Sequence, residues 1–277
     1  MLSIKCFHVK LLSLLISALL LVSCQTERGE NELILGSIAG PETTLMRTAI
    51  EVAATRYNLT IKLVEFEDYT LPNTALAEGA IDANVFQHEA YLSLVRHYRN
   101  YPIESIGQTF IYPMGIYSLK LTDLAQIPIG ATVAIPNDPS NSARALRLLA
   151  KAKLINIPDE NDMQLNVKSI YNNPYQLTFK ELEAAQLPRI LSDVELAVIN
   201  TNFALPAGLM PHQDALAVET KTSRYANVVV VRAAEKGAPK YQKLLAALQS
   251  PEVLAKAQQV FHEQAIPAWS VTTEPPP

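Results

Sequence analysis

Apolar and polar positions along this chain predict short buried strands that alternate with helices. Residues 33–38 are apolar except at Gly36 and Ser37, as in a buried strand, whereas residues 43–57 have helical spacing. Further along we expect a strand over 59–66, a helix over 72–79, a strand over 80–85 and a helix over 88–98. This alternation is typical of an α/β fold.

A second set of the same kind begins near position 110. We expect strands or extended segments over 110–118, 132–135, 167–171, 177–182, 196–199 and 227–232, and helices over 138–152, 184–191 and 240–261. Asp138 is expected to cap its helix, with Pro139 at the first helical position. The pattern therefore predicts two lobes, each a mostly parallel sheet covered by helices.

The order of these segments predicts that the chain passes between the lobes twice. We assign residues 32–112 and 227–270 to one lobe and 113–226 to the other, with hinges near 110–118 and 203–226. Ligands bind beyond the carboxyl ends of parallel strands, so the two lobes should share a ligand cleft.

Both ends of the chain are expected to lie outside these lobes. Residues 1–23 are interpreted as a secretory signal, because Lys5 and Lys10 accompany an apolar stretch too short to span about 30 Å of hydrocarbon. Residues 24–31 are a polar tether, and the proline-rich residues 271–277 are expected to be disordered.

Cys24 directly follows the tripeptide Leu-Val-Ser at the end of the apolar stretch. This tetrapeptide resembles the lipobox of bacterial lipoproteins. The resemblance implies that Cys24 carries a diacylglyceryl group and becomes the new N-terminus, so that acyl chains anchor the protein to a lipid bilayer. An ordinary signal peptide with an incidental cysteine is the alternative.

Charge and cysteine content narrow the classes of function. The net charge of −4 disfavours nucleic acid as a partner and disfavours a polybasic membrane surface. The two cysteines are Cys6, within the signal, and Cys24, so none remains for a disulfide, a nucleophile or a thiolate metal site. The sequence also lacks a Gly-x-Ser-x-Gly elbow, a phosphate-binding glycine loop and a His-Glu-x-x-His helix. We therefore expect no enzyme, no metal and no cofactor.

Several polar and aromatic residues instead gather where predicted strands give way to helices. They are Tyr69, Phe86, His88, Tyr91, Arg144 and Asn202. Asn227, which begins the strand predicted over 227–232, is considered with them. Taken singly, each has an ordinary structural explanation as a core aromatic residue, a helix start, a solvated helix residue or a turn former. Together they suit a zwitterion with an apolar side chain.

Each part of such a ligand has a matching group among these residues. The guanidinium of Arg144 offers a planar fork for a carboxylate, and the amide oxygens of Asn202 and Asn227 suit an ammonium group. The aromatic residues and His88 could enclose an apolar or sulfur-containing tail, since thioethers contact ring edges favourably.

This interpretation is supported by five longer segments, residues 68–73, 81–88, 133–139, 182–189 and 196–202. In this order they resemble the signature segments of the NlpA-type methionine-binding lipoproteins, the substrate-binding proteins of methionine ABC importers. The similarity runs from the lipobox to about Trp269. It implies a type II-like two-lobe periplasmic-binding-protein fold that closes on free L-methionine or D-methionine. It also implies docking on a permease driven by a separate ATPase.

Matched by position, the resemblance implies an aromatic cage of Tyr69, Phe86, His88 and Tyr91, a carboxylate-binding Arg144, and polar ligands Asn202 and Asn227, with Asn141 as a further candidate. The protein would then face the periplasm or the exterior from a bacterial membrane. Two alternatives stay open: a surface lipoprotein with an adhesion or assembly role, and a paralogue that binds another amino-acid derivative or a peptide. A hydrolase or lyase is disfavoured, because no nucleophile–base pair can be assigned.

Overall fold

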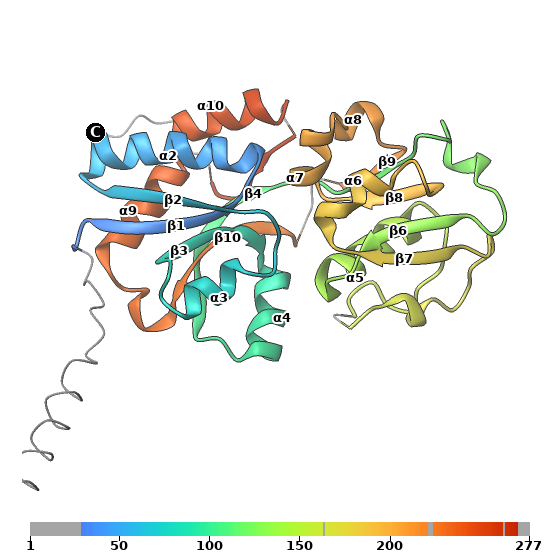
Figure 1. Ribbon diagram of the computed structural model, residues 1–277, viewed down its shortest axis with the longest axis horizontal. Helices are drawn as coiled ribbons and strands as arrows, with labels where there is room; N and C mark the ends of the chain where they lie inside the picture. The colour runs from blue at the N-terminus through green and yellow to red at the C-terminus, as the bar shows by residue number, and fades with distance from the viewer. Residues whose placement is uncertain (1–28, 163, 221–223, 263, 271–277) are drawn as a thin grey trace, which may run out of the picture. The chain divides into compact units, whose positions relative to one another are not determined.

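The computed structural model describes residues 29–162, 164–220, 224–262 and 264–270. The chain divides into two units, Met1–Glu30 and Asn31–Pro277. The predicted signal, Cys24 and the 271–277 tail lie outside the described residues. Two β-sheets with their covering helices make up the second unit (Figure 1). None of the helices in the described ranges is both long and apolar enough to cross a membrane.

The first sheet has six strands in the order β11-β4-β10-β3-β1-β2. Their bounds are β1 Glu32–Ile38, β2 Thr60–Phe66, β3 Ala83–His88, β4 Ile103–Ile111, β10 Ala226–Arg232 and β11 Ile266–Pro267. Strand β1 pairs in parallel with β2 and β3, whereas β10 runs antiparallel to both β3 and β4. Strand β11 is antiparallel to β4.

Helices cover both faces of this sheet. Helices α2 (Pro41–Tyr57), α9 (Pro239–Leu248) and α10 (Pro251–Val260) lie on one face, and α3 (Pro72–Ala77) and α4 (Glu89–Arg99) lie on the other (Figure 1). Successive side chains of a strand point to opposite faces. Accordingly, Val229 and Val231 pack in the core under α2 and α9, whereas Val228 and Val230 pack in the core under α3 and α4.

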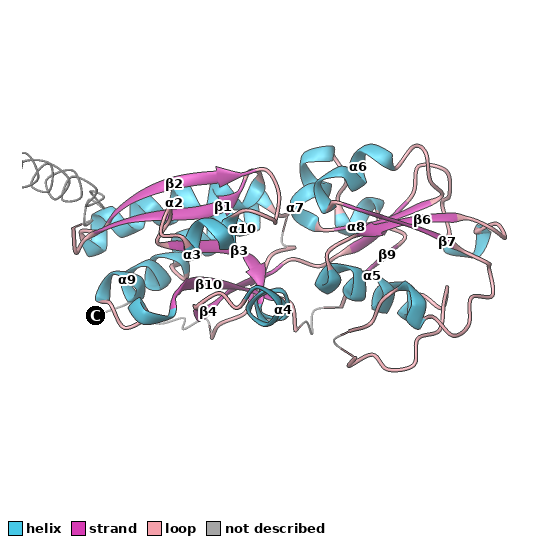
Figure 2. Ribbon diagram, turned by 60° about the horizontal axis from the view of Figure 1, so that its bottom comes forward, coloured by secondary structure: helices cyan, strands magenta, loops and turns pink. Residues whose placement is uncertain are grey.

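The second sheet has five strands in the order β7-β6-β8-β5-β9. Its strands β6, β7 and β9 are labelled in Figure 2. Their bounds are β5 Gly115–Tyr117, β6 Thr132–Pro136, β7 Thr178–Leu182, β8 Leu196–Ile199 and β9 Ala217–Val218. Strand β6 is parallel to β7 and β8, and β5 is antiparallel to β8 and β9. Residues of α5 (Pro139–Lys151) share one core with the sheet, and residues of α6 (Leu187–Ile190) and α7 (Thr201–Ala204) share another.

The remaining helical elements are short. They are α8 (Pro211–Asp214) and the 3-10 turns Leu124–Gln126, Val167–Ser169, Ala184–Gln186, Leu205–Ala207 and Ala233–Glu235. Consecutive strands β4 and β5 belong to different sheets, as do β9 and β10. The chain therefore passes between the sheets twice, while the assignment of lobe boundaries and hinges stays a prediction.

The predicted α/β class is confirmed, but both sheets are mixed rather than mostly parallel. The antiparallel pairings arise where the chain leaves or re-enters a sheet. The single strand predicted over 110–118 is wrong, because β4 ends at Ile111 and β5 begins at Gly115. Pro113 lies between them and has no N–H to donate to a ladder.

Three further predictions of elements are wrong in detail. The helix predicted over 240–261 is two helices, because Ser250 caps α10 and Pro251 occupies its first turn. The strand predicted over 80–85 lies at Ala83–His88. All six of its residues are buried, so polarity does not mark where it begins. The extended segment predicted over 167–171 is instead a 3-10 turn, which the capping box of Asn166 and Ser169 stabilises.

Candidate functional site

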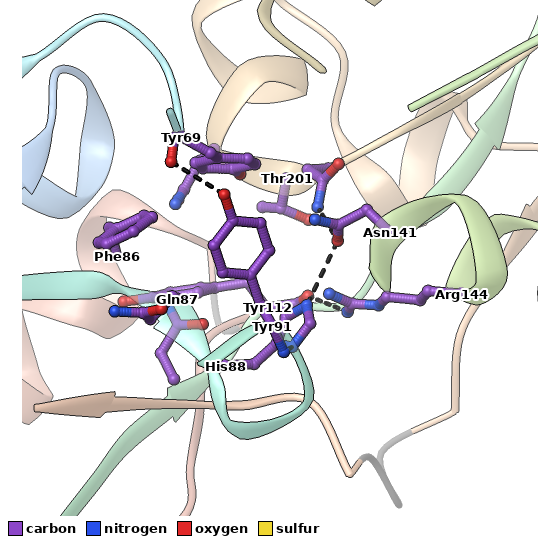
Figure 3. A pocket seen from close by; sticks show the side chains of 12 residues that line it. Tyr69, Phe86, Gln87, His88, Tyr91, Tyr112, Asn141, Arg144 and Thr201 are labelled. Carbon is purple, nitrogen blue, oxygen red and sulfur yellow. Dashed lines mark hydrogen bonds between the residues drawn. The ribbon is translucent and has the colours of Figure 1, made fainter. Parts of the chain in front are cut away.

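A pocket lies between the two sheets and draws its walls from both (Figure 3). Its empty volume, the opening to solvent included, is about 380 Å³, which is in the range of small-molecule sites. The lining residues are Tyr69, Phe86, Gln87, His88, Tyr91, Tyr112, Asn141, Arg144, Asn200, Thr201, Asn202 and Asn227. All eight residues predicted from the sequence are among them, and their role in binding stays a prediction.

Three aromatic rings form one wall. The Tyr69 ring centroid lies 5.9 Å from that of Phe86 and 6.2 Å from that of Tyr91. The Tyr91 hydroxyl donates a hydrogen bond to the Tyr69 carbonyl oxygen at 2.9 Å (Figure 3). Phe203, on α7, places a further ring 5.1 Å from Tyr69. The wall is apolar and has tilted and edge-on ring contacts, as aromatic pairs prefer.

His88 ends β3 and caps α4. Its Nδ1 accepts a hydrogen bond from the Tyr91 backbone N–H at 3.2 Å, so the ring proton belongs on Nε2, which lies 3.3 Å from Asn141 Oδ1. Burial, and then the positive charge of Arg144, lower the pKa of His88 to about 3. His88 is therefore a neutral donor in this pocket at physiological pH.

Asn141 connects His88 to the second sheet. Its backbone N–H and its side-chain amide donate to Asp138, the N-cap of α5. Its Oδ1 also accepts from Asn200 Nδ2 at 2.9 Å. Burial raises the pKa of Asp138. The amide of Asn141 thus has partners on both sides, and its orientation follows from them.

Arg144 supplies a fixed positive charge at the pocket wall. The residue is 3% exposed. Its Nε donates to Glu219 Oε1 at 2.9 Å, and its Nη2 donates to the Tyr112 carbonyl oxygen at 2.9 Å. Burial alone would lower the pKa of Arg144, but the charge and hydrogen bonds of Glu219 outweigh it and raise the pKa. The guanidinium carbon lies 4.3 Å from the centroid of the Tyr225 ring, a cation–π contact.

Glu42 is a buried carboxyl group that the sequence analysis did not identify. It lies in the first turn of α2 and is 1% exposed. Asn202 Nδ2 donates to Glu42 Oε2 at 3.1 Å, and Asn227 Nδ2 donates to Glu42 Oε1 at 3.0 Å. Burial raises the pKa of Glu42 to about 7 against these hydrogen bonds. Gly40, before the helix, has φ 136°, a conformation that favours glycine.

Two amide oxygens of the pocket lining have no hydrogen-bond partner in the described part of the chain. They are Asn200 Oδ1 and Asn202 Oδ1, and both are buried. Buried polar atoms nearly always have partners, and leaving one without is costly. These two acceptors therefore indicate a ligand with hydrogen-bond donors.

Glu42, Glu219 and Asn200 are functional candidates that sequence reasoning missed. Glu42 follows a buried strand at the start of a helix, the same position that identified the other candidates. An acidic residue in a first turn is nevertheless common, because the helix dipole favours it there. Glu219 is far from Arg144 in sequence, so only the fold reveals their pairing. Within the described ranges, no group of three or more His, Cys, Asp or Glu could hold a metal ion.

Comparison with known proteins identifies the family of this chain. The family model of the NlpA lipoproteins matches residues 33–269. The chain is 43% identical over 258 residues to the D-methionine-binding lipoprotein MetQ of Escherichia coli strain K12, covering 92% of this chain and 95% of the relative.

Two solved structures are similar over most of the chain. A periplasmic substrate-binding protein of an ABC transporter from Coxiella burnetii is 51% identical with a TM-score of 0.82, covering 85% of this chain and 100% of that one. A nutrient-binding protein from Burkholderia cenocepacia bound to methionine is 44% identical with a TM-score of 0.84, covering 86% and 100%. By its sequence and its fold, this chain belongs to the NlpA lipoprotein family.

Proposed function

We propose that this protein captures free methionine, the L form and also the D form, in the pocket and delivers it to an ABC importer. The observation that carries the proposal is the meeting of three chemistries in one cavity. Arg144 is a buried cation for the carboxylate, the unpartnered oxygens of Asn200 and Asn202 suit the ammonium, and the aromatic wall suits the thioether tail. Glu42 does not line the pocket, but its buried carboxyl group accepts hydrogen bonds from Asn202 and Asn227, which do. The methionine-binding relatives support the same ligand.

The carboxylate would bind the guanidinium edge that Glu219 leaves open. Glu219 already accepts from Nε and Nη2 of Arg144, so it fixes the plane of the guanidinium before a ligand arrives. Each hydrogen bond to a charged group contributes about 1.5–3 kcal/mol. Preorganisation of this kind lowers the entropy cost of binding.

The ammonium group would lie against the two unpartnered oxygens of Asn200 and Asn202, with the carboxyl group of Glu42 behind Asn202. This arrangement revises the predicted role of Asn227, whose amide nitrogen donates to Glu42. Asn227 would then hold the carboxyl group in place. Together with burial of the side chain, these contacts suffice for roughly −8 to −11 kcal/mol, which is micromolar to tens of nanomolar affinity.

The location and the partners of the protein are proposed from its family. We propose that Cys24 is acylated, that the protein faces the periplasm or the exterior from a membrane of the cell envelope, and that it docks on a permease served by a separate ATPase. Its ligand would leave chemically unaltered. A role limited to adhesion or assembly is not favoured, because the pocket lining offers a cation, amide oxygens and aromatic rings that suit an amino acid.

Native mass spectrometry and calorimetry test the proposal. The full-length protein, purified in detergent, should retain or bind methionine and release it with unchanged mass. Titration with each of the common amino acids should show the tightest binding for methionine. Lack of binding to any amino acid would contradict the proposal. Recovery of a peptide in the pocket would favour the paralogue alternative.

A further inference from the structure

We infer that three buried amide side chains, Asn73, Asn84 and Gln87, act as a clamp that sets the distance between Tyr69 and Phe86 and thereby the side-chain selectivity of the pocket. This inference rests on the proposed function. It assigns a positioning role to Asn73 and Asn84, which do not line the pocket, and to Gln87, which does.

The three amides bond chiefly to one another. Asn73 Nδ2 donates to Gln87 Oε1 at 2.8 Å, and Gln87 Nε2 donates back to Asn73 Oδ1 at 2.6 Å. Gln87 Nε2 also donates to Asn84 Oδ1 at 2.9 Å, and Asn84 Nδ2 donates to Asn73 Oδ1 at 3.0 Å. None of the three residues is more than 3% exposed. The network therefore connects strand β3 to the start of α3 away from water.

The clamp fastens the segment that carries Tyr69. Asn73 lies in the first turn of α3, four residues after Tyr69, which lies in the connection between β2 and α3. Gln87 lies between Phe86 and His88 on β3. Each bond between Asn73 and Gln87 thus holds the Tyr69 segment against the strand that carries Phe86 and His88. The bond from the Tyr91 hydroxyl to the Tyr69 carbonyl fastens the same segment from α4.

Hydrogen bonds between these amides restrict the geometry of the contact between β3 and α3 more than apolar contacts would. Hydrogen bonds fix distances and angles, whereas apolar side chains of similar size tolerate sliding. A fully bonded buried network favours one arrangement, because any shift leaves a donor or acceptor without a partner. The spacing of the Tyr69 and Phe86 rings, 5.9 Å between centroids, is therefore set by the clamp and not by ring packing alone.

The first test measures selectivity in the full-length protein. Gln87→Met keeps the length of the side chain and removes all three hydrogen bonds that involve Gln87. We expect the ratio of the Kd for leucine to the Kd for methionine to fall at least about fivefold, since hydrophobic pockets discriminate such ligands by about 10–200-fold. Asn84→Ala should have a smaller effect, because the reciprocal pair of Asn73 and Gln87 remains.

Asn173→Ala is the matched control. Its amide braces a loop of the second sheet through Leu177, donating to the carbonyl oxygen and accepting from the N–H at 2.9 Å each. This variant should lower the thermal unfolding temperature without changing the selectivity ratio. A Gln87→Met ratio within twofold of wild type, in protein that still binds methionine, would overturn the clamp.

The second test does not depend on any ligand. Hydrogen exchange of backbone amides in residues 67–73 should accelerate at least about tenfold in Gln87→Met, because local opening then costs less. The same segment in Asn173→Ala should exchange as in wild type. Unchanged exchange over 67–73 in Gln87→Met would overturn the clamp, whether or not the protein binds an amino acid. A wild-type protein that did not bind methionine would contradict only the proposed function.

Discussion

Arg144 and Glu219 form a two-bonded ion pair in the pocket wall, with Nε to Oε1 at 2.9 Å and Nη2 to Oε2 at 2.5 Å. Both side chains are largely buried. A buried charge without a partner is strongly destabilising, so Glu219 allows Arg144 to stay charged and ordered in the empty pocket. The ligand carboxylate would join this pair and not replace Glu219.

Removing the guanidinium should weaken ligand binding, and it should also destabilise the fold because Glu219 loses its buried partner. We expect Arg144→Ala to weaken methionine binding at least about 100-fold, because the carboxylate loses charge-assisted hydrogen bonds. Arg144→Lys should also bind poorly, since an ammonium cannot serve Glu219, Tyr112 and a ligand in one plane. Calorimetry measures both.

Arg99→Ala is the control for this series, because Arg99 is exposed at the end of α4. Its affinity should equal that of wild type. An unchanged affinity in Arg144→Ala would remove Arg144 from the binding site.

In the ligand-free protein, ionisation of Glu42 should lower the free energy of unfolding at neutral and alkaline pH. Its folded pKa of about 7 lies above the ordinary glutamate pKa of 4.5, so the folded state holds its proton more tightly than the unfolded chain. The resulting stabilisation is full below pH 4.5 and is lost as the pH rises through about 7. Glu42→Gln should thus gain stability relative to wild type between pH 5 and pH 8, by about 1–3 kcal/mol.

Thermal or urea unfolding without ligand measures this difference at each pH. The same variant should bind methionine at least about tenfold more weakly, because the ammonium loses an anionic partner. A variant that gained no stability with rising pH would show that Glu42 is already ionised in the empty pocket.

Methionine binding should release protons near neutral pH. An ammonium group beside Glu42 lowers the pKa of this carboxyl group, so a proton held in the empty pocket leaves on binding. We expect the Kd to increase as the pH falls from 8 to 5. His88, with its pKa of about 3, does not change charge over this range.

Calorimetry in two buffers of different ionisation enthalpy counts the protons released. Glu42→Gln serves as the control and should abolish the release at pH 6.5. Equal proton release in this variant would assign it to another group, with Asp138 the next candidate because burial also raises its pKa.

The sequence predicted the pocket better than it predicted the sheets. Seven of the eight candidates lie at strand-to-helix junctions, and such junctions meet at the same sheet edge. Asn227 lies instead near the start of β10, where it pairs with His88 of β3. Tyr69, His88 and Arg144 come from three separate segments, yet all line one cavity.

What the sequence could not show depends on contacts between distant residues. The antiparallel course of β10 beside β3 and β4 follows from a return crossing that no local pattern specifies. The partners Glu219 and Glu42 share no motif with Arg144 and Asn227. Burial raises the pKa of Glu42, and Glu219 forms a buried ion pair with Arg144. Both properties depend on the folded structure.

Tyr69 should determine which side chains the pocket accepts. Its ring lies against Phe86, Tyr91 and Phe203, so Tyr69→Ala would open the wall that faces the thioether. We expect methionine to bind about 10–100-fold more weakly and alanine to bind nearly as before, since only the tail loses contacts. Tyr98→Ala, which removes an exposed ring of α4, should leave both affinities unchanged. If Tyr69→Ala discriminated between methionine and alanine as strongly as wild type in parallel titrations, the aromatic wall would not be the side-chain site.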